Sequence, residues 1–147
     1  PPRDEPFEAE WLSFACVMIR REVIETIGLL DEGYFLYFED SDYCRAARAA
    51  GYRIQCFPSA RVVHLRGGAS AAKPQPEERK RAPRYLYASR TRYFRKGYGT
   101  LGLWAANALW CVGRGLSLSR EFAGRKLLHI PEKAWLDNWT DAFKPQS

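Results

Sequence analysis

Residues 31–70 read DEGYFLYFEDSDYCRAARAAGYRIQCFPSARVVHLRGGAS, and the pattern of this stretch decides the predicted fold. Two acidic pairs, Asp31-Glu32 and Glu39-Asp40, lie on either side of the aromatic run YFLYF. Exposed backbone N–H groups at the start of a helix stabilise negative charge, so a carboxylate held there stays ionised near neutral pH. Such a carboxylate can accept a proton from a hydroxyl in a transition state. The alternative is that these acids only cap a helix.

The residues after the second acidic pair predict a helix followed by two strands. Asp42 is placed to open the helix, alanines continue it, and Gly51 is suited to end it. Residues 52–57 and 60–65 are β-like runs, and His64 lies at the end of the second, close to a pair of glycines. Carboxylates at a helix start, with a histidine at a nearby strand end, favour a functional site over a core alone.

Four segments in this order resemble the C-terminal half of the catalytic domain of family 2 glycosyltransferases, which has the GT-A fold. They read FACVMIRREVIETIG, DEGYFLYFEDSD, GYRI…P…A…VVH and SRTRYFRK. The likeness is greatest to the bacterial rhamnosyltransferase-like enzymes of cell-surface polysaccharide synthesis, and it covers residues 11–70 and, more loosely, the chain to residue 96. We therefore predict an α/β fold, the C-terminal portion of a GT-A domain followed by a helical C-terminal extension.

The resemblance implies an inverting transfer of a sugar from a nucleotide-sugar to an acceptor hydroxyl. In the family, the aspartate of the Glu-Asp pair is the catalytic base, which here is Asp40, with Glu39 as a supporting acid. The histidine after the last core strand, here His64, can help to hold the Mg²⁺ or Mn²⁺ that binds the donor diphosphate. A core histidine with satisfied hydrogen bonds is the alternative for His64.

Family members usually carry a Gly-Ala pair where this chain has Phe14-Ala15, so Phe14 would narrow an acceptor pocket. The candidate substrate-binding residues are Asp31, Glu32, Asp42, Phe14 and Arg66.

The resemblance also implies a nucleotide-binding βαβ half with a metal-binding Asp-x-Asp, which we do not find in this sequence. Asp40-Ser41-Asp42 has that spelling but aligns with the base motif. We therefore expect a fragment that is inactive alone. Residues 1–98 are predicted to be the acceptor-side part of the transferase domain, and residues 99–147 a helical basic-aromatic extension. The sequence identifies neither the sugar, the nucleotide nor the acceptor.

The N-terminal residues predict an irregular start, a strand and a short helix. Residues 1–10 are rich in proline and acids, and residues 11–19 are almost entirely apolar, as in a fully buried strand. Arg20 and Arg21 then open a predicted helix over residues 22–27. The arginine pair is either a solvated helix start or a contact near phosphate.

The cysteine pattern favours reduced thiols. With 147 residues the chain can bury a core without disulfides, and its four cysteines have no zinc-like spacing. Cys16, Cys44 and Cys56 fall on predicted core elements, so buried thiols in a cytoplasmic protein are expected.

Behind the acidic stretch, the sequence predicts a loop and three helices. Residues 71–83 read as an exposed loop and residues 84–98 as a helix. Residues 100–112 are apolar on nearly every face, too few to span a bilayer, and contain two tryptophans that favour a membrane interface. Packing on the rest of the enzyme, or in a dimer, is the alternative. A further amphipathic helix is predicted from Pro131.

The positive charge is concentrated in one part of the chain. Residues 1–72 hold 8 Lys/Arg and 11 Asp/Glu, whereas residues 73–126 hold 13 and 3, a balance of +10. For an enzyme we expect a nucleotide-sugar donor, a lipid-linked or saccharide acceptor, no nucleic acid, and a cytoplasmic location with peripheral contact at the inner membrane face. A homo-oligomer is left open. The second hypothesis is a non-enzymatic basic and aromatic module that binds a membrane surface or nucleic acid through residues 79–126.

Overall fold

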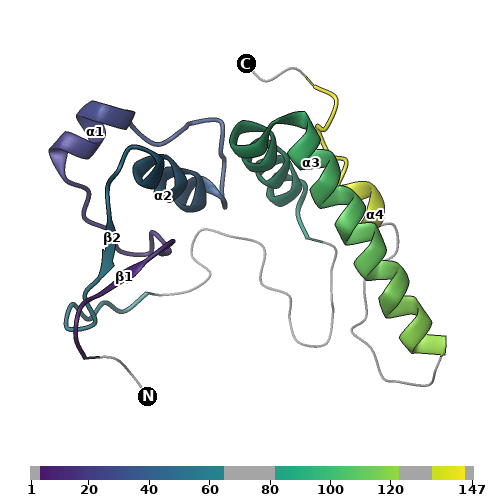
Figure 1. Ribbon diagram of the computed structural model, residues 1–147, viewed down its shortest axis with the longest axis horizontal. Coiled ribbons are helices and arrows are strands. Elements are labelled where there is room, and N and C mark those ends of the chain that lie inside the picture. The colour runs from purple at the N-terminus through teal and green to yellow at the C-terminus, as the bar shows by residue number, and fades with distance from the viewer. Residues whose placement is uncertain (1–3, 65–81, 123–133, 145–147) are drawn as a thin grey trace. The chain divides into compact units, whose positions relative to one another are not determined.

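The computed structural model describes residues 4–64, 82–122 and 134–144 of the chain. The chain divides into two compact units, Pro1–Gly68 and Ala69–Ser147 (Figure 1). The first unit combines helices with a small two-stranded sheet, and the described part of the second is helical, which does not contradict the predicted α/β class. The predicted division between residues 98 and 99 falls within the second unit and stays a prediction.

Both helices expected in the first unit are confirmed. α1 spans Arg21–Ile27 and ends at Gly28, whose N–H donates to Ile24 O at 2.8 Å. α2 spans Glu39–Ala49, so the acids of the Glu-Asp block lie in its first turn. The sequence therefore located both helices to within three residues at each end.

A small apolar cluster joins the two helices of the first unit. The ring of Phe14 packs edge to face on Tyr43, with 6.0 Å between the ring centroids. The Tyr43 hydroxyl donates to Gly28 O at 3.0 Å, which fixes α2 against the end of α1. Tyr52 makes a second link, because its hydroxyl lies 2.8 Å from Thr26 Oγ1. The buried members of the cluster are Val23, Tyr43 and Ala47, with Phe14, Ile19, Ile27 and Tyr52 packed against them.

The sheet differs from the prediction in one of its strands. β1, Phe7–Ala9, pairs antiparallel with β2, Ile54–Cys56, and Glu8 lies opposite Gln55. β2 lies inside the run predicted over residues 52–57. β1 falls in the stretch that was expected to be irregular, where its short length and acidic neighbours hide the pattern of a strand.

The strands predicted over residues 11–19 and 60–65 are wrong for the residues that the structure describes. Residues 11–20 and 60–64 contain no strand, and Met18 and Val63 are exposed. An apolar run becomes a strand only where a neighbouring strand can accept its hydrogen bonds. In the described part of the first unit, the only such pairing is between β1 and β2.

The burial expected for the cysteines is confirmed at one position. Cys44 on α2 is buried, but Cys56 is only half-buried and Cys16 is exposed. Cys16 was expected inside the strand over residues 11–19, and without that strand nothing covers it. The fourth cysteine, Cys111, is also exposed.

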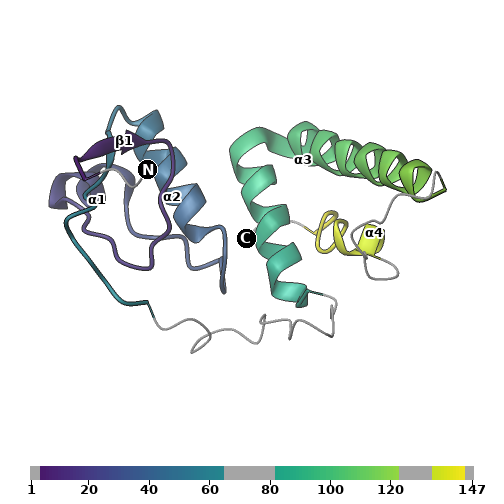
Figure 2. The same ribbon diagram turned by 90° about the horizontal axis from the view of Figure 1, so that it is seen from below.

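One long helix with a kink dominates the second unit. α3 spans Arg84–Phe122 and is interrupted at Gly99, which has a φ of 70° and a ψ of −176° (Figure 2). The two helices predicted over residues 84–98 and 100–112 are therefore confirmed as the arms of α3, and the second arm continues ten residues further.

Two glycines allow this kink. The φ of Gly99 lies in the left-handed region that side-chain-bearing residues rarely adopt. Three residues later, a Cβ placed on Gly102 would lie 2.2 Å from Cβ of Tyr98, far inside van der Waals contact. The second arm can therefore approach the end of the first only because residue 102 has no side chain.

Among the described residues, no helix is both long and apolar enough to cross a membrane.

The C-terminal residues pack against both arms of α3. α4 is only Ala134–Asp137, much shorter than the helix predicted from Pro131, which itself lies outside the described residues. The helix ends early because turns follow it, with Thr140 N–H donating to Asp137 O at 3.0 Å. Asn107, fully buried on the second arm, donates through Nδ2 to Asn138 O at 3.0 Å.

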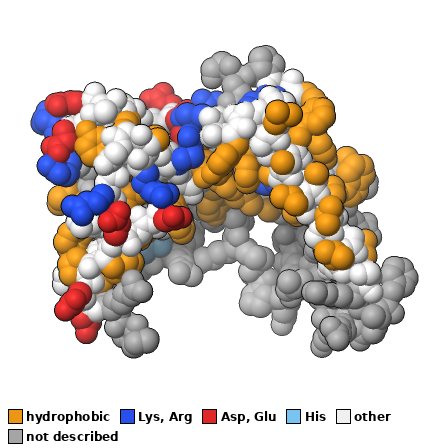
Figure 3. Space-filling model, in the orientation of Figure 1, with side chains coloured by type: hydrophobic (Ala, Val, Ile, Leu, Met, Phe, Trp, Pro, Cys, Tyr) orange, Lys and Arg blue, Asp and Glu red, His pale blue; other side chains and the backbone are white. Residues whose placement is uncertain are grey.

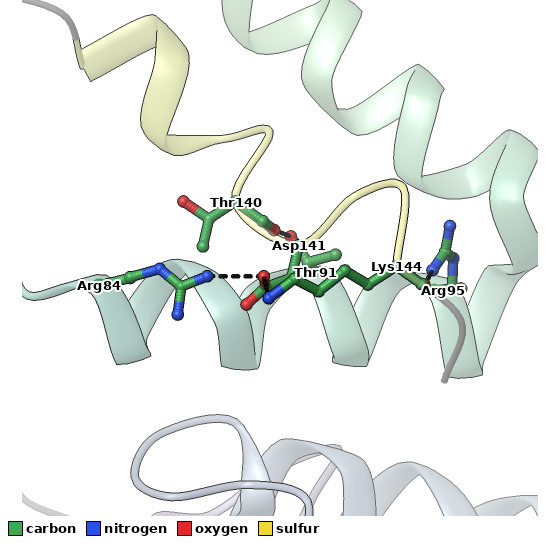
Figure 4. A network of polar contacts seen from close by, with 6 residues as sticks. All are labelled: Arg84, Thr91, Arg95, Thr140, Asp141 and Lys144. Atoms are coloured by element: carbon green, nitrogen blue, oxygen red, sulfur yellow. Dashed lines mark hydrogen bonds and ion pairs between the residues drawn. The ribbon is translucent and has the colours of Figure 1, made fainter. Parts of the chain in front are cut away.

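Polar contacts fix the same segment to the first arm (Figure 4). Arg84 lies 2.6 Å from Asp141, and Thr91 Oγ1 donates to Thr140 O at 2.8 Å. Arg95 donates to the carbonyl oxygens of Ala142 and Lys144. Hydrogen bonding from Lys144, and then the nearby Arg84, lower the pKa of Asp141 despite its partial burial. Residues 138–144 therefore hold the kinked helix from the inside of its bend.

We expect Gly102→Ala to lower the free energy of unfolding by about 1–3 kcal/mol, because the new Cβ must displace Tyr98. The matched control is Gly113→Ala in the same arm, where a Cβ meets nothing within 4 Å. Replacing a helical glycine by alanine in open space should raise stability by up to about 1 kcal/mol. Urea unfolding followed by circular dichroism measures both changes. Equal stabilisation of the two variants would contradict the close approach at Gly102.

Candidate active site

The chain enters α2 through two aromatic residues with left-handed backbone. Tyr37 has a φ of 69° and Phe38 a φ of 70°, and neither is a glycine. Such a conformation costs of order 1–3 kcal/mol per residue and is common at functional sites. Phe38 is the N-cap, and its carbonyl oxygen accepts the N–H of Asp42 at 2.9 Å. This turn makes Glu39 the first residue of the helix.

Asp40 lies half-buried in the first turn of α2. Its Oδ1 accepts the backbone N–H of Ser41 at 2.6 Å and the Ser41 hydroxyl at 3.2 Å. The unpaired N–H groups of a helix start stabilise a negative charge at this position. Within the described residues, no hydrogen bond is made to Oδ2, so this oxygen is the one that can accept a proton.

Glu39 is half-buried, and its Oε2 is fully covered. No hydrogen-bond partner for this oxygen is present among the described residues. A covered carboxylate oxygen without a donor is uncommon in folded proteins and marks a place where a further donor is required. Glu39 therefore has one carboxylate oxygen, next to Asp40 in the sequence, without a hydrogen-bond donor in the described part of the chain.

Asp42 is buried and has a structural role in the same turn. Its Oδ1 lies 2.7 Å from Nη2 of Arg45, one helical turn later. The pair gives the buried carboxylate a countercharge.

Cys44, one turn after Asp40, is also buried, and its thiol lies 3.9 Å from Leu12 O. Burial raises the pKa of the Cys44 thiol, and the negative charge of Asp40 acts in the same direction.

The first acidic pair shapes the loop that leads to the aromatic run. Asp31 Oδ1 accepts the N–H of Gly33 at 2.9 Å, and its carbonyl oxygen accepts the N–H of Tyr34 at 3.2 Å. The side chain of Glu32 is exposed. Asp31 thus has a local role in the turn whether or not it also binds a substrate.

The remaining predicted site residues are not brought to the start of α2 by any contact among the described residues. Phe14 is part of the apolar cluster through its contact with Tyr43. His64 is exposed and lies at the end of a described segment, and Arg66 lies outside the described residues. In the described part of the chain, no group of three or more His, Cys, Asp or Glu side chains is arranged to hold a metal ion.

No family model matches this chain, and no solved structure gives a significant match. Several curated proteins do match. The chain is 36% identical over 74 residues to the N-acetylglucosaminyl-diphospho-decaprenol L-rhamnosyltransferase of Mycobacterium tuberculosis, covering 49% of this chain and 24% of that protein. It is 35% identical over 69 residues to the O-antigen biosynthesis protein RfbC of Myxococcus xanthus, covering 46% of this chain and 5% of that protein. Identity to the dTDP-rhamnosyl transferase RfbF of Shigella flexneri is 28% over 65 residues, covering 44% and 22%.

About half of this chain is similar to proteins named as rhamnosyltransferases. The resemblance drawn from the sequence is therefore confirmed, over about half of the chain. The aligned stretch spans a quarter or less of the length of each of these relatives.

Three features of this candidate site were not predicted from the sequence. The left-handed backbone of Tyr37 and Phe38 had no signal, because turns of this kind usually carry Gly or Asn. The Ser41 contacts follow from its place beside Asp40 and could have been found from the Asp-Ser pair. Arg45 three residues after Asp42 is a recognisable helical ion-pair spacing, which predicts a structural role for Asp42.

We expect Asp42→Asn to lower the free energy of unfolding by about 1–3 kcal/mol, because it removes the charge that Arg45 pairs with in a buried position. The matched control is Asp40→Asn, two residues earlier. Its amide oxygen can still accept from Ser41, so we expect a change within about 0.5 kcal/mol, as for ordinary half-exposed positions. Urea unfolding of the two variants separates them. A loss at Asp40 as large as that at Asp42 would make Asp40 a structural residue.

Proposed function

We propose that this chain contributes the acceptor side of a GT-A type glycosyltransferase. The enzyme would transfer a sugar from a nucleotide-sugar to an acceptor hydroxyl in the synthesis of a cell-surface glycan. The observation that carries the proposal is the similarity to proteins named as rhamnosyltransferases and as an O-antigen biosynthesis protein. The acidic start of α2 supports it, because deprotonation of a hydroxyl requires an accessible carboxylate.

In the proposed mechanism, Asp40 is the general base. The acceptor oxygen attacks the anomeric carbon as its proton passes to Oδ2 of Asp40, and the bond from that carbon to the donor diphosphate breaks. Because the hydroxyl attacks from the face opposite the diphosphate, the anomeric configuration is inverted. Ser41 holds Oδ1 through its N–H and hydroxyl, which orients Oδ2 for the incoming proton.

The neighbouring residues would have supporting roles. Glu39 would be a supporting acid beside Asp40, and its covered Oε2 has no hydrogen-bond donor among the described residues. Asp42 and Arg45 hold the first turn in place. Asp31 and Glu32, in the loop before α2, stay candidates for acceptor contacts, as do Phe14 and Arg66.

The metal ion stays a proposal about the full-length enzyme. The described residues contain no group of three or more His, Cys, Asp or Glu side chains that could hold a metal ion. We propose that His64 supplies one ligand of a Mg²⁺ or Mn²⁺ ion and that other parts of the enzyme supply the remaining ligands. The proton transfer to Asp40 does not depend on that ion.

We propose a lipid-linked or saccharide acceptor and a cytoplasmic location. Because two of the relatives are named as rhamnosyltransferases, dTDP-rhamnose is the first donor to test. We expect this chain alone to have no transfer activity.

The test of the base is Asp40→Asn in the full-length enzyme. We expect kcat to fall by ~10²–10⁴-fold, the usual effect of losing a general base, while the Kd for the donor stays unchanged. Transfer of labelled sugar to the acceptor measures kcat, and calorimetric titration measures donor binding. Glu39→Gln is the matched control and should reduce kcat less. A near-normal kcat for Asp40→Asn would refute the assignment of the base.

A further inference from the structure

The second arm of α3 leaves a wide uncharged face exposed. Every exposed residue from Thr100 to Ser119 is uncharged. Figure 3 shows hydrophobic side chains gathered along this helix. Residues three, four, seven or eight positions apart lie on one side of a helix, and four large apolar residues follow these spacings. They are Leu101, Leu109, Val112 and Leu116, with exposed fractions of 84%, 71%, 59% and 62%.

This face is distinct from the one that packs inside the unit. Leu103 and Asn107 are fully buried, and Asn107 is bonded both to Asn138 O and to Arg90. Trp104 lies at the border of the two faces, with its ring 6.4 Å from that of Trp139 and half of its surface exposed. The helix is thus already held on its inner side, and the exposed leucines are not required for that contact.

The charge around this arm indicates what covers the exposed face. Residues 73–126 hold 13 Lys/Arg against 3 Asp/Glu, yet within residues 100–119 the one charged side chain is Arg114, which is half-buried. A second copy of the chain on the apolar face would bring two segments of charge +10 together. An anionic surface is attracted instead, with ~1 kcal/mol for each Lys or Arg near it.

We infer that this face, defined as the exposed residues of 100–119, binds the surface of an anionic lipid bilayer with the helix lying in the plane of the interface. Helices that lie on membranes place an apolar face in the lipid and carry Lys and Arg beside it. Here the apolar face lies on the helix, and the basic residues lie in the sequence that flanks it. The leucines and Trp104 would enter the boundary between headgroups and acyl chains, and the positive charge of the flanking sequence would favour anionic headgroups. This inference does not depend on Asp40 or on the proposed transfer reaction.

The test is sedimentation of the 147-residue chain with vesicles of phosphatidylglycerol and phosphatidylcholine, or of phosphatidylcholine alone, at low and high salt. We expect binding to the anionic vesicles at least tenfold stronger than to the neutral ones, and we expect high salt to weaken it because salt screens the attraction between the basic residues and the lipid. Equal partitioning to both vesicle types, or to neither, would overturn the inference even if no variant could be prepared.

Variants then locate the contact. Leu109→Ser with Leu116→Ser should lower the partition coefficient by about tenfold or more, because two apolar side chains no longer enter the lipid. The matched control is Leu29→Ser with Val63→Ser, which changes residues of similar exposure, 77% and 86%, in the first unit. This control should bind as the unchanged chain does, and circular dichroism should show equal helix content in all three proteins. If the first pair binds normally, or if it only dissociates a dimer that ultracentrifugation detects, the face is not a membrane contact.

Discussion

The left-handed turn at Tyr37 and Phe38 is the constraint on which the candidate site depends. Because the chain reverses there, Phe38 O accepts the N–H of Asp42 and the helix begins at Glu39. An N-cap with extended backbone, as at Arg20 before α1, would also start a helix, but the aromatic run would then approach Glu39 and Asp40 from a different direction. The aromatic side chains offer no local advantage for a positive φ, so packing elsewhere in the unit must compensate for the strain.

The residues after this turn include both the proposed base and residues that stabilise α2. Asp40 accepts from Ser41 through Oδ1, and its Oδ2 makes no hydrogen bond within the described residues, whereas Asp42 is buried and paired with Arg45. Tyr43 and Ala47 then anchor α2 on α1 through the apolar cluster, with a hydrogen bond from Tyr43 to Gly28. One short helix therefore carries both the proposed base and the contacts that keep it in place. In the second unit, Gly99 and Gly102 allow α3 to bend, and contacts from residues 138–144 stabilise that bend.

The sequence predicted helices better than strands, and the reason is the range of the interactions. α1, α2 and both arms of α3 depend on local spacing, caps and glycines, which a sequence displays directly. The strands over residues 11–19 and 60–65 depended on partners that the pattern of a single segment cannot specify. The length predicted for the C-terminal helix was wrong for a similar reason. Hydrogen bonds to Asn107 and Arg95 hold residues 138–144 in turns and not in a helix. At the candidate site, the sequence predicted that the acids lie at a helix start, which α2 confirms, but it did not predict the left-handed turn or the Asp42–Arg45 pair.

The stereochemistry of transfer tests the central claim most directly, because a single displacement assisted by Asp40 inverts the anomeric carbon. Nuclear magnetic resonance of the product made by the full-length enzyme gives the configuration of the new glycosidic bond. We expect the anomeric configuration of the new glycosidic bond to be opposite to that of the donor within the first turnovers. A product with the donor's configuration would contradict it, because retention requires a covalent intermediate or another route in which Asp40 is not the base that activates the acceptor.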